Sequence, residues 1–494
     1  MRRRTDGVIL LAIAAGAVAL AALSRFHHDL AIDEPFTALA VASPATLDQT
    51  LVHDNVPFFY ALLLAWTRAF GESAFALRAM STAAFGGTIL FSAAAARRIA
   101  STRAAWLTAV LTACSVTFGL QPAATARPYA LAALFAAMAL WAAMRVSETM
   151  STPRATAPVL ASHLLGLFTH PVFVFVSAAS AAAGLTAGGK RRLALSAAPV
   201  AAIAIYLAIR WPSIRQTVDL PIRTWMTRPS ARDLLAGWLV WGDHSTPILA
   251  ALLVVLLALW RARRSMPGDP RIVQPVIYAT VTAVGVLAGT FAVSQITPVY
   301  LAARTPIFVL PSIALVLGVA IAELAPAIVH LAVTLLVVSS AVRYTARSWR
   351  APDPFPTRAS LAAVAGRAAC GDTIVAAGLS YAPIVYYASA AGLPACVRVT
   401  AFPEDVHAHP GWLDLSPQTA TALPAQAAAA VARLPPGGHV WVLAQSQDVG
   451  KAQTDVLVRE LSRHRRLEET LPLPGSFFSE IVAFGPAAQP KTRP

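Results

Sequence analysis

The chain has 494 residues, of which 57% are hydrophobic and only 13% are charged. Soluble globular proteins carry about a quarter charged residues, so this composition excludes an ordinary soluble protein. The formal net charge of +15 comes mainly from arginines, many of which form short clusters between long apolar runs. That distribution indicates a membrane protein and argues against a nucleic-acid-binding surface.

The apolar runs predict a polytopic α-helical membrane protein with about 11 transmembrane helices, because a bilayer core needs about 20 apolar residues per helix. Arginine and lysine clusters such as Arg97-Arg98 and Lys190-Arg191-Arg192 fall on one side of this threading. The positive-inside rule then places the amino terminus in the cytoplasm and the protein in the cytoplasmic (inner) membrane. The expected spans are 7–24, 79–96, 104–121, 128–144, 156–170, 172–188, 193–210, 246–260, 273–293, 305–322 and 327–343.

Two segments near the amino terminus need separate interpretation. The first apolar run ends in Leu23-Ser24-Arg25, a poor cleavage site, so we expect an uncleaved first helix and not a signal peptide. Residues 57–78 begin with an aromatic, apolar stretch that is short and soon interrupted by charges. A helix lying in the membrane interface fits this stretch better than a span. The C-terminal segment is then expected outside the cytoplasm.

The sequence changes character after residue 345. A proline-rich linker (351–356) leads into short β-branched runs that alternate with helical patterns. This rhythm predicts a small, extracytoplasmic α/β domain over 346–494, with a mainly parallel sheet, after a membrane domain over 1–345. The expected strands are Thr373–Ala376, Val397–Thr400, Val440–Leu443 and Ile481–Phe484, and the expected helices are Tyr381–Ala391, Pro417–Leu434 and Val449–Arg463.

Three cysteines allow limited conclusions. Cys114 lies in an apolar span, where an inert, packed thiol is the expected state. Cys370 and Cys396 flank the first βαβ-like unit of the C-terminal domain. They could form a disulfide in an oxidising compartment, and the sequence leaves this open.

Asp33 and Glu34 stand side by side just beyond the first apolar run, in an outer loop expected over 25–78. A carboxylate pair so close to a bilayer costs free energy unless it is solvated, paired or used. Taken alone, the pair fits solvated loop acids at the membrane surface. The residues that follow it make a functional role the better interpretation.

Further polar and aromatic residues fall on the same expected outer side. Each has an ordinary explanation by itself, since an arginine at a helix end can extend to lipid headgroups and a histidine at a turn can be a plain interfacial residue. Their shared side is the reason to group them as candidate substrate-binding residues. They are His53, Pro57, Tyr60, Arg78, Arg127, Tyr129, His170 and Arg304.

The motifs occur in a specific order: an acidic pair, His53-x-x-x-Pro57 with aromatics, a Gly-Glu-Ser-x-Phe-Ala-Leu-Arg run ending at Arg78, Ala-Arg-x-Tyr-Ala-Leu around Arg127, Thr-His at His170, and Arg304 before an apolar span. This order resembles the GT-C superfamily of polyprenyl-phosphate-dependent membrane glycosyltransferases. It is similar in particular to the protein O-mannosyltransferase and lipid A aminoarabinose transferase branch. The resemblance covers roughly the membrane domain, and it implies a GT-C-like fold.

The resemblance implies transfer of a sugar from a polyprenyl-phosphate donor to a lipid, glycan or protein acceptor of the cell envelope. Asp33 is the candidate general base, because a carboxylate can take the proton of an attacking hydroxyl, and a single displacement inverts the anomeric carbon. Glu34 is expected to hold Asp33, to bind the sugar or to bind a cation. Arg127 and Arg304 can neutralise the departing phosphate.

The sequence also allows a second function and predicts which partners the protein binds. A transporter or flippase of an anionic lipid-linked substrate is the second interpretation, although transporters usually carry charges near the bilayer midplane and internal repeats. No cofactor is predicted; Glu34, His53 and His244 are compatible with a divalent metal ion, but their spacing is not diagnostic. Membrane lipids are expected partners and nucleic acid is not.

Overall fold

The computed structural model describes residues 2–31, 33–42, 44–53, 56–148, 153–218, 228–233, 269–300, 304–404, 417–445, 448–473 and 478–487. The chain divides into two compact units. The first comprises residues 1–27, 54–215 and 226–350, and the second comprises 28–53, 216–225 and 351–494. The sequence predicts a domain boundary at residue 345, and in this division the first unit ends at residue 350. The sequence also assigns the outer loop 25–78 to the membrane domain, whereas residues 28–53 group here with the C-terminal domain.

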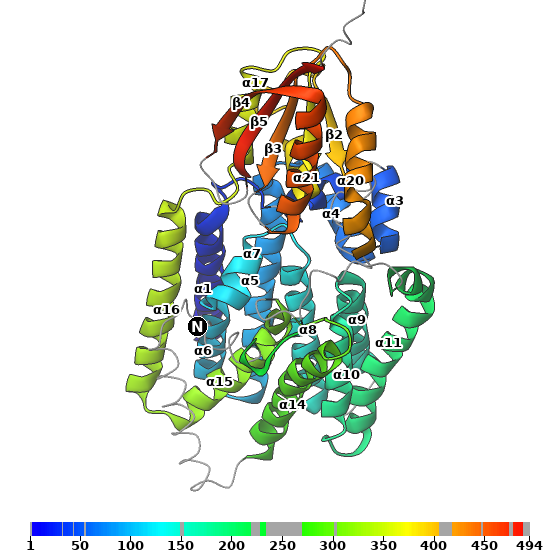
Figure 1. The fold of residues 1–494 in the computed structure, drawn as a ribbon. Coiled ribbons are helices and arrows are strands. Elements are labelled where there is room, and N and C mark those ends of the chain that lie inside the picture. The colour runs from blue at the N-terminus through cyan, green and yellow to red at the C-terminus, as the bar shows by residue number, and fades with distance from the viewer. Residues whose placement is uncertain are drawn as a thin grey trace, which may run out of the picture. The chain divides into compact units, whose positions relative to one another are not determined.

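The described part of the first unit is all helical, and Figure 1 labels most of its helices. In chain order they are α1 (Arg2–Arg25), α4 (Pro57–Phe70), α5 (Ala74–Ile99), α6 (Thr102–Ala113), η1 (Val116–Leu120), α7 (Gln121–Ala123), α8 (Tyr129–Glu148), α9 (Pro153–Thr169), α10 (Phe173–Gly184), α11 (Gly189–Val218), α14 (Pro270–Ser294), η2 (Thr305–Val309), α15 (Leu310–Leu324) and α16 (Ala327–Arg350).

Seven helical segments of the described chain are long and apolar enough to cross a membrane. They are Thr5–Arg25, Ala74–Ile99, Tyr129–Val146, Gly189–Arg215, Pro270–Ser294, Thr305–Leu324 and Ala327–Arg350. Each overlaps one expected span. The expected spans 156–170 and 172–188 fall on the shorter helices α9 and α10, and 246–260 lies outside the described residues. The count of about 11 spans stays a prediction.

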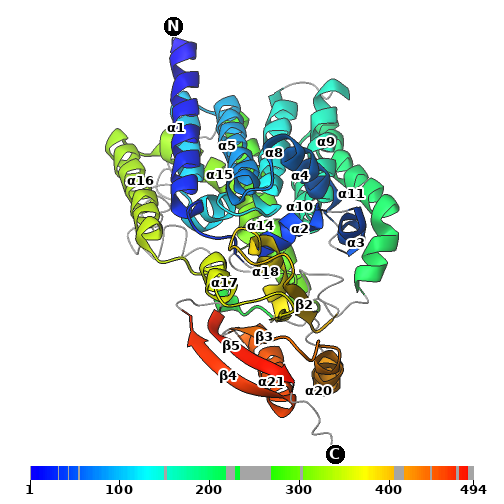
Figure 2. The same ribbon diagram turned by 90° about the horizontal axis from the view of Figure 1, so that it is seen from above.

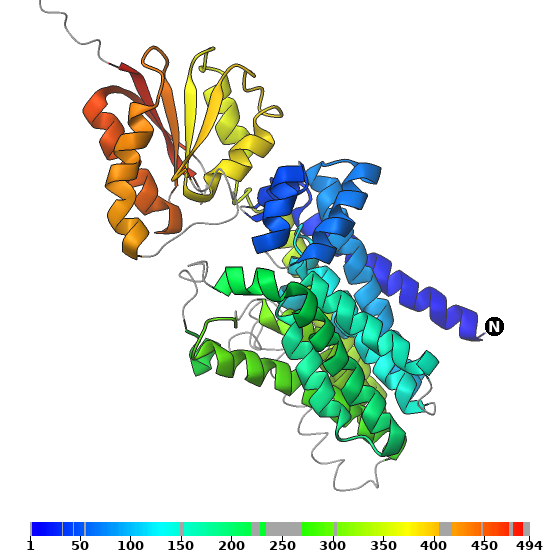
Figure 3. The ribbon, with the colours of Figure 1, turned by 90° about the vertical axis from the view of Figure 1, so that its right-hand side faces the viewer.

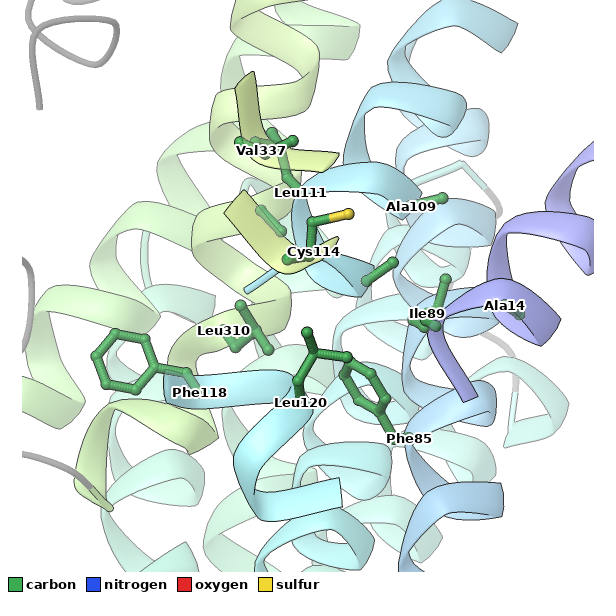
Figure 4. Packing of buried hydrophobic residues seen from close by; sticks show 14 of the residues in the cluster. Ala14, Phe85, Ile89, Ala109, Leu111, Cys114, Phe118, Leu120, Leu310 and Val337 are labelled. Atoms are coloured by element: carbon green, nitrogen blue, oxygen red, sulfur yellow. The ribbon is translucent and has the colours of Figure 1, made fainter. Parts of the chain in front are cut away.

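The expected third span, 104–121, is not one continuous helix. Its two parts, Thr102–Ala113 and Val116–Ala123, are bent by 71° with respect to each other, and η1 begins the second part as a π-helical turn. Gly119 makes the close approach to α5 feasible, because a Cβ there would lie 2.8 Å from Cζ of Phe85. Figure 4 shows Phe85, Cys114 and Leu120 within the buried cluster around this bend. Cys114 is buried with a free thiol, as expected of a packing residue.

The first and last helices of this unit pack against each other. Helices α1 and α16 lie side by side in Figures 1 and 2, and Thr345 Oγ1 donates to the carbonyl oxygen of Leu20 at 3.4 Å. Helix α4 has 14 residues, which corresponds to about 21 Å at 1.5 Å per residue. That length is too short for a hydrocarbon core of about 30 Å, and the expected position of α4 in the membrane interface stays a prediction.

The second unit contains a five-stranded sheet with strand order β2-β1-β3-β5-β4, and Figure 3 shows helices on both of its faces. Buried side chains of α20 and α21 form one core with the sheet, including Ala427, Leu457 and Leu461. The elements of this unit are α2 (Asp33–Ala40), α3 (Pro44–His53), α17 (Thr357–Ala365), β1 (Thr373–Ala377), η3 (Gly378–Ser380), α18 (Tyr381–Tyr387), β2 (Arg398–Phe402), α20 (Pro417–Ala432), β3 (Val440–Gln445), α21 (Asp448–His464), β4 (Arg465–Pro472) and β5 (Phe478–Ala487).

All four expected strands are present, but the prediction of a mainly parallel sheet is wrong. Strand β1 pairs in parallel with β2 and β3, whereas β5 pairs antiparallel with β3 and β4. Strand β4 begins Arg-Arg-Leu-Glu-Glu. This charged run lacks the β-branched residues that predict a strand, so the sequence did not indicate it. Because only a short loop joins β4 to β5, the two strands form an antiparallel hairpin. Cys370 and Cys396 are joined by a disulfide, with their Cα atoms 5.0 Å apart.

Candidate functional site

The acidic pair opens helix α2, where the exposed backbone N–H groups of a first turn favour negative charge. Glu34 is 1% exposed, and its Oε2 accepts a hydrogen bond from the Ala31 N–H at 2.8 Å. The Glu34 N–H in turn donates to the Ala31 carbonyl at 2.8 Å. Glu34 therefore holds the turn that precedes the helix. Asp33 is only half-buried and is the more accessible carboxylate of the two.

The backbone just before Asp33 is fixed by residues more than 320 positions away, within the same unit. The Asp29 N–H donates to Asp353 Oδ2 at 2.7 Å, and the Leu30 N–H donates to the Tyr387 hydroxyl at 2.6 Å. Asp29 Oδ2 accepts from the Arg358 N–H at 2.8 Å, and the Arg358 guanidinium lies 3.4 Å from Asp29 Oδ1. The Asp33 segment is thus held by the linker and helices of the C-terminal domain.

Sequence reasoning did not identify Asp29, Asp353, Arg358 or Tyr387 as part of this arrangement. Each is an unremarkable polar residue in its own segment. Only their meeting in the fold shows their role. The one available signal was the position of Asp29 four residues before Asp33, which by itself predicts nothing.

A second group of candidate residues meets in the first unit. Arg304 Nη1 donates to the Tyr129 hydroxyl at 3.0 Å, and the Arg304 guanidinium carbon lies 5.5 Å from the centre of the Tyr129 ring. The Tyr129 and His170 rings have centroids 5.3 Å apart, and His170 is 5.0 Å from Phe308. Tyr129 begins α8, and His170 lies in the turn between α9 and α10. Arg304 directly precedes η2, and Phe308 lies within η2.

His170 is held neutral in this cluster. It lies in the turn after α9, where its Nδ1 accepts a hydrogen bond from the Val172 N–H at 3.2 Å. Burial lowers the pKa of His170 to about 3, and the positive charges of Arg127 and Arg304 act in the same direction. Both arginines are therefore close enough to the ring to disfavour its protonation. The cluster presents arginine charge beside neutral aromatic rings, which is an arrangement suited to an anion.

Two of the remaining candidates, Arg78 and Tyr60, are buried in the first unit. Arg78 is 1% exposed, and its Nη1 donates to the Arg25 carbonyl at 2.7 Å. It thereby satisfies a carbonyl at the last residue of α1, a role that sequence reasoning did not anticipate. Tyr60 is 2% exposed within α4. His53 is the last residue of α3, but its side chain lies outside the described residues.

Pro57, the first residue of α4, lines an open groove of ≈390 Å³ in the first unit. The lining is apolar except for one arginine, so the groove combines walls suited to a hydrocarbon chain with one cationic group. Arg210, which contributes that charge, was not among the expected site residues. The lining residues are Pro57, Phe58, Leu164, Leu165, Phe168, Ile209 and Arg210.

No cluster of three or more metal-ligand side chains occurs among the described residues. His244 lies outside them, as does the side chain of His53. The metal hypothesis for Glu34, His53 and His244 is therefore not tested. Asp33 and Glu34 belong to the second unit, whereas the Arg304 cluster and the groove belong to the first.

Solved structures with this architecture decide the fold. ArnT from Cupriavidus metallidurans in the apo state is similar with a TM-score of 0.65 and 13% identity, over 98% of this chain and 98% of that one. The chain shares the fold of ArnT. The structure of ArnT bound to undecaprenyl phosphate is similar with a TM-score of 0.62 and 13% identity, over 96% of this chain and 97% of that one.

A further similarity is to the Archaeoglobus fulgidus oligosaccharyltransferase tethered with an acceptor peptide, with a TM-score of 0.50, 11% identity, and coverage of 95% of this chain and 74% of that one. No protein-family model matches the sequence, and no curated protein sequence matches it. The ArnT-like architecture confirms the expected fold class, a helical part with apolar, membrane-length helices followed by a C-terminal sheet domain. The protein is a multi-pass membrane protein.

Proposed function

We propose that this protein is an integral membrane glycosyltransferase that moves a sugar from a polyprenyl-phosphate donor to an acceptor in the cell envelope. The observation that carries the proposal is the ArnT fold, shared over 98% of both chains. One solved form of that neighbour is bound to undecaprenyl phosphate. Four of the residues that the GT-C resemblance singled out by sequence order gather in one cluster of the first unit, namely Arg127, Tyr129, His170 and Arg304. Nothing in the described part of the chain favours the transporter alternative.

The donor contains an apolar prenyl chain and a charged phosphate, and the first unit offers a suitable surface for each. The groove beside Pro57 has apolar walls for a prenyl chain, and Arg210 is its one charged lining residue. The pairing of Arg304 with Tyr129 holds a guanidinium in one orientation, with further donor N–H groups in a planar fork that suits phosphate oxygens. Arg127 adds a second positive charge near His170. We assign phosphate binding to Arg127 and Arg304.

The reaction in this proposal is a single displacement. The acceptor hydroxyl oxygen attacks the anomeric carbon of the donor sugar while Asp33 takes the hydroxyl proton. The bond from the anomeric carbon to the phosphate oxygen breaks, and the polyprenyl phosphate leaves with the electron pair. One displacement inverts the anomeric carbon. Glu34 keeps the Asp33 turn in place through its bond to Ala31.

Location and acceptor are part of the same proposal. The positive-inside pattern supports insertion in the cytoplasmic membrane with the amino terminus in the cytoplasm and the C-terminal domain outside. The acceptor is then a lipid, glycan or protein of the envelope at the outer surface.

The test compares envelope glycans and lipids by mass spectrometry in cells with the gene, without it, and with the Asp33→Asn variant. We expect one sugar modification to disappear in the deletion strain, to return with the wild-type gene, and to stay absent with Asp33→Asn. Unchanged glycans and lipids in the deletion strain would overturn the proposal. Accumulation of a lipid-linked sugar on the cytoplasmic side would instead support the transporter.

A further inference from the structure

Three arginines from three separate helices line a cavity of ≈600 Å³ in the first unit. Arg98 lies in the last turn of α5, Arg191 in the first turn of α11, and Arg271 in the first turn of α14. No carboxylate is among the described residues that line it. The remaining lining residues are Ile99, Ala187, Gly188, Pro270, Gln274 and Pro275.

The position of the cavity along the helices is informative. Helices α5, α11 and α14 are all long and apolar enough to cross a membrane, and the three arginines lie where these apolar stretches end. The cavity therefore lies at the boundary between hydrocarbon and water. Trp141 supports this placement, since the guanidinium carbons of Arg98 and Arg145 lie 5.5 and 5.8 Å from its ring centre. Tryptophan beside cationic side chains is typical of the interface.

Two nearby acids contact groups other than the three lining guanidinium groups. Asp6 lies 3.2 Å from Arg97, which is not one of the lining residues. The Asp269 side chain accepts a hydrogen bond from the Arg271 backbone N–H at 2.8 Å and so caps α14. The cavity thus has a concentrated positive charge and the first turns of two helices, whose N–H groups add to the attraction for an anion.

Apolar side chains on the same turns favour a lipid over a soluble anion. Leu193, two residues after Arg191, is 71% exposed, and Val273, two residues after Arg271, is 39% exposed. One turn further along α14, Ile277 is 37% exposed. Such residues suit acyl chains that continue from a headgroup held by the arginines.

We infer that this cavity binds the phosphate headgroup of an anionic phospholipid. Basic pockets between membrane helices take such headgroups, and three guanidinium groups offer charge-assisted hydrogen bonds to phosphate oxygens. The positive-inside pattern places the site at the cytoplasmic surface, so it is distinct from the candidate donor site. The inference does not depend on the proposed transferase activity.

The test uses the purified full-length protein and native mass spectrometry with added phosphatidylglycerol, cardiolipin or phosphatidylcholine. The pocket variant is Arg191→Gln with Arg271→Gln. The control variant is Arg192→Gln with Arg103→Gln, which removes the same charge from exposed arginines outside the lining. We expect the pocket variant to bind the two anionic lipids at least about tenfold more weakly than wild type, while the control binds like wild type.

A second arm separates a lipid from a soluble phosphate compound. Glycerol 3-phosphate and inorganic phosphate are added as competitors, and retention of the anionic lipid is followed. We expect neither to displace the lipid at concentrations similar to that of the lipid. Equal weakening in the control variant, equal binding of phosphatidylcholine, or displacement by the soluble phosphates would overturn the inference.

Discussion

At the scale of single residues, the acidic pair separates into two roles. Glu34 is buried and accepts the Ala31 N–H, so its oxygen is used in holding the turn. Asp33 occupies the first position of the same helix and is more accessible. The two adjacent carboxylates therefore differ in their surroundings, and we propose the more accessible Asp33 as the group that takes the proton.

The first prediction follows from this difference. Asp33→Asn should lower turnover by about 10²–10⁴-fold, since the amide cannot accept the acceptor proton, while the amount of inserted protein stays unchanged. Asp48→Asn is the matched control, because it replaces an exposed acid by its amide in the same loop and should keep activity. Turnover by sugar transfer to the acceptor is the measurement. A well-folded Asp33→Asn protein with wild-type turnover would remove Asp33 as the base.

The arginine cluster allows a second prediction. Arg304→Ala and Arg127→Ala should each raise the KM for the lipid-phosphate donor by about tenfold or more, because a charge-assisted contact to phosphate is lost. Tyr129→Phe should give a smaller increase, since the ring remains but the hydroxyl that accepts from Arg304 is absent. Arg343→Ala, on the exposed side of α16, is the control.

Donor titration in nanodiscs measures these effects, with thermal unfolding followed in parallel. If both arginine variants keep the wild-type donor KM, the two side chains only interact with lipid headgroups. In that case phosphate binding must be assigned elsewhere, and Arg210 at the groove is the next candidate.

At the scale of elements, the second unit shows how a segment without regular structure can be ordered just before helix α2. The segment at Asp29 and Leu30 has no helix or strand of its own, and its backbone N–H groups are instead satisfied by Asp353 and Tyr387. Buried N–H groups need such partners. The C-terminal domain therefore contributes to the order of the loop that carries Asp33.

The third prediction tests this contribution. Tyr387→Phe removes the hydroxyl that accepts from Leu30, so the loop before Asp33 should move more freely and turnover should fall by about tenfold through poorer alignment. The donor KM should change little, because the groups assigned to the donor are not altered. Tyr386→Phe is the control, since it changes the adjacent ring and leaves the Leu30 bond intact. Limited proteolysis within residues 28–53 reports loop mobility. If that cleavage and turnover are both unchanged in Tyr387→Phe, the tyrosine is not a positioning residue.

At the scale of the whole molecule, the proposed chemistry depends on topology. The charge pattern predicts that the loop before α4, the loop after α11 and the C-terminal domain are all on one side of the membrane. The short helix α4 must then lie in the interface and not span. An additional span at this point would move every later loop to the opposite side.

The fourth prediction concerns this arrangement. Single cysteines at Asp48, Arg232 and Ala425 should react with an impermeant thiol reagent in intact cells. Cysteines at Thr102 and Thr186 should react only after the membrane is opened. Labelling of the cysteine at Asp48 with protection of the one at Arg232 would mean that α4 spans, and would contradict the proposed topology.

The background for this experiment follows from the structure. Cys370 and Cys396 are joined in a disulfide and do not react as thiols, whereas Cys114 is a buried free cysteine. A Cys114→Ser background therefore suffices and keeps the disulfide in place. The unmodified background protein should show no labelling with the impermeant reagent.

Much of the fold was predictable because it depends on local sequence. Apolar runs of sufficient length define membrane helices whatever their neighbours are, and the β-branched runs at Thr373, Arg398, Val440 and Ile481 became β1, β2, β3 and β5. Strand β4 was missed because its pattern is charged. It forms a strand through its pairing with β5, and the sheet is mixed because β5 runs antiparallel to β3 as well.

Some features of the candidate site were likewise predictable from the sequence, and others depend on tertiary contacts. Residue type and order were enough to single out Asp33, Arg304, Tyr129 and His170, because acids and arginines near a membrane are costly and so indicate function. Only the tertiary structure decided that Arg78 satisfies the end of α1. It also decided that Glu34 holds its own turn, that residues 353–387 anchor the loop, and that Arg210 borders a groove. These roles depend on contacts between distant segments, and no local pattern encodes which distant segment a side chain will meet.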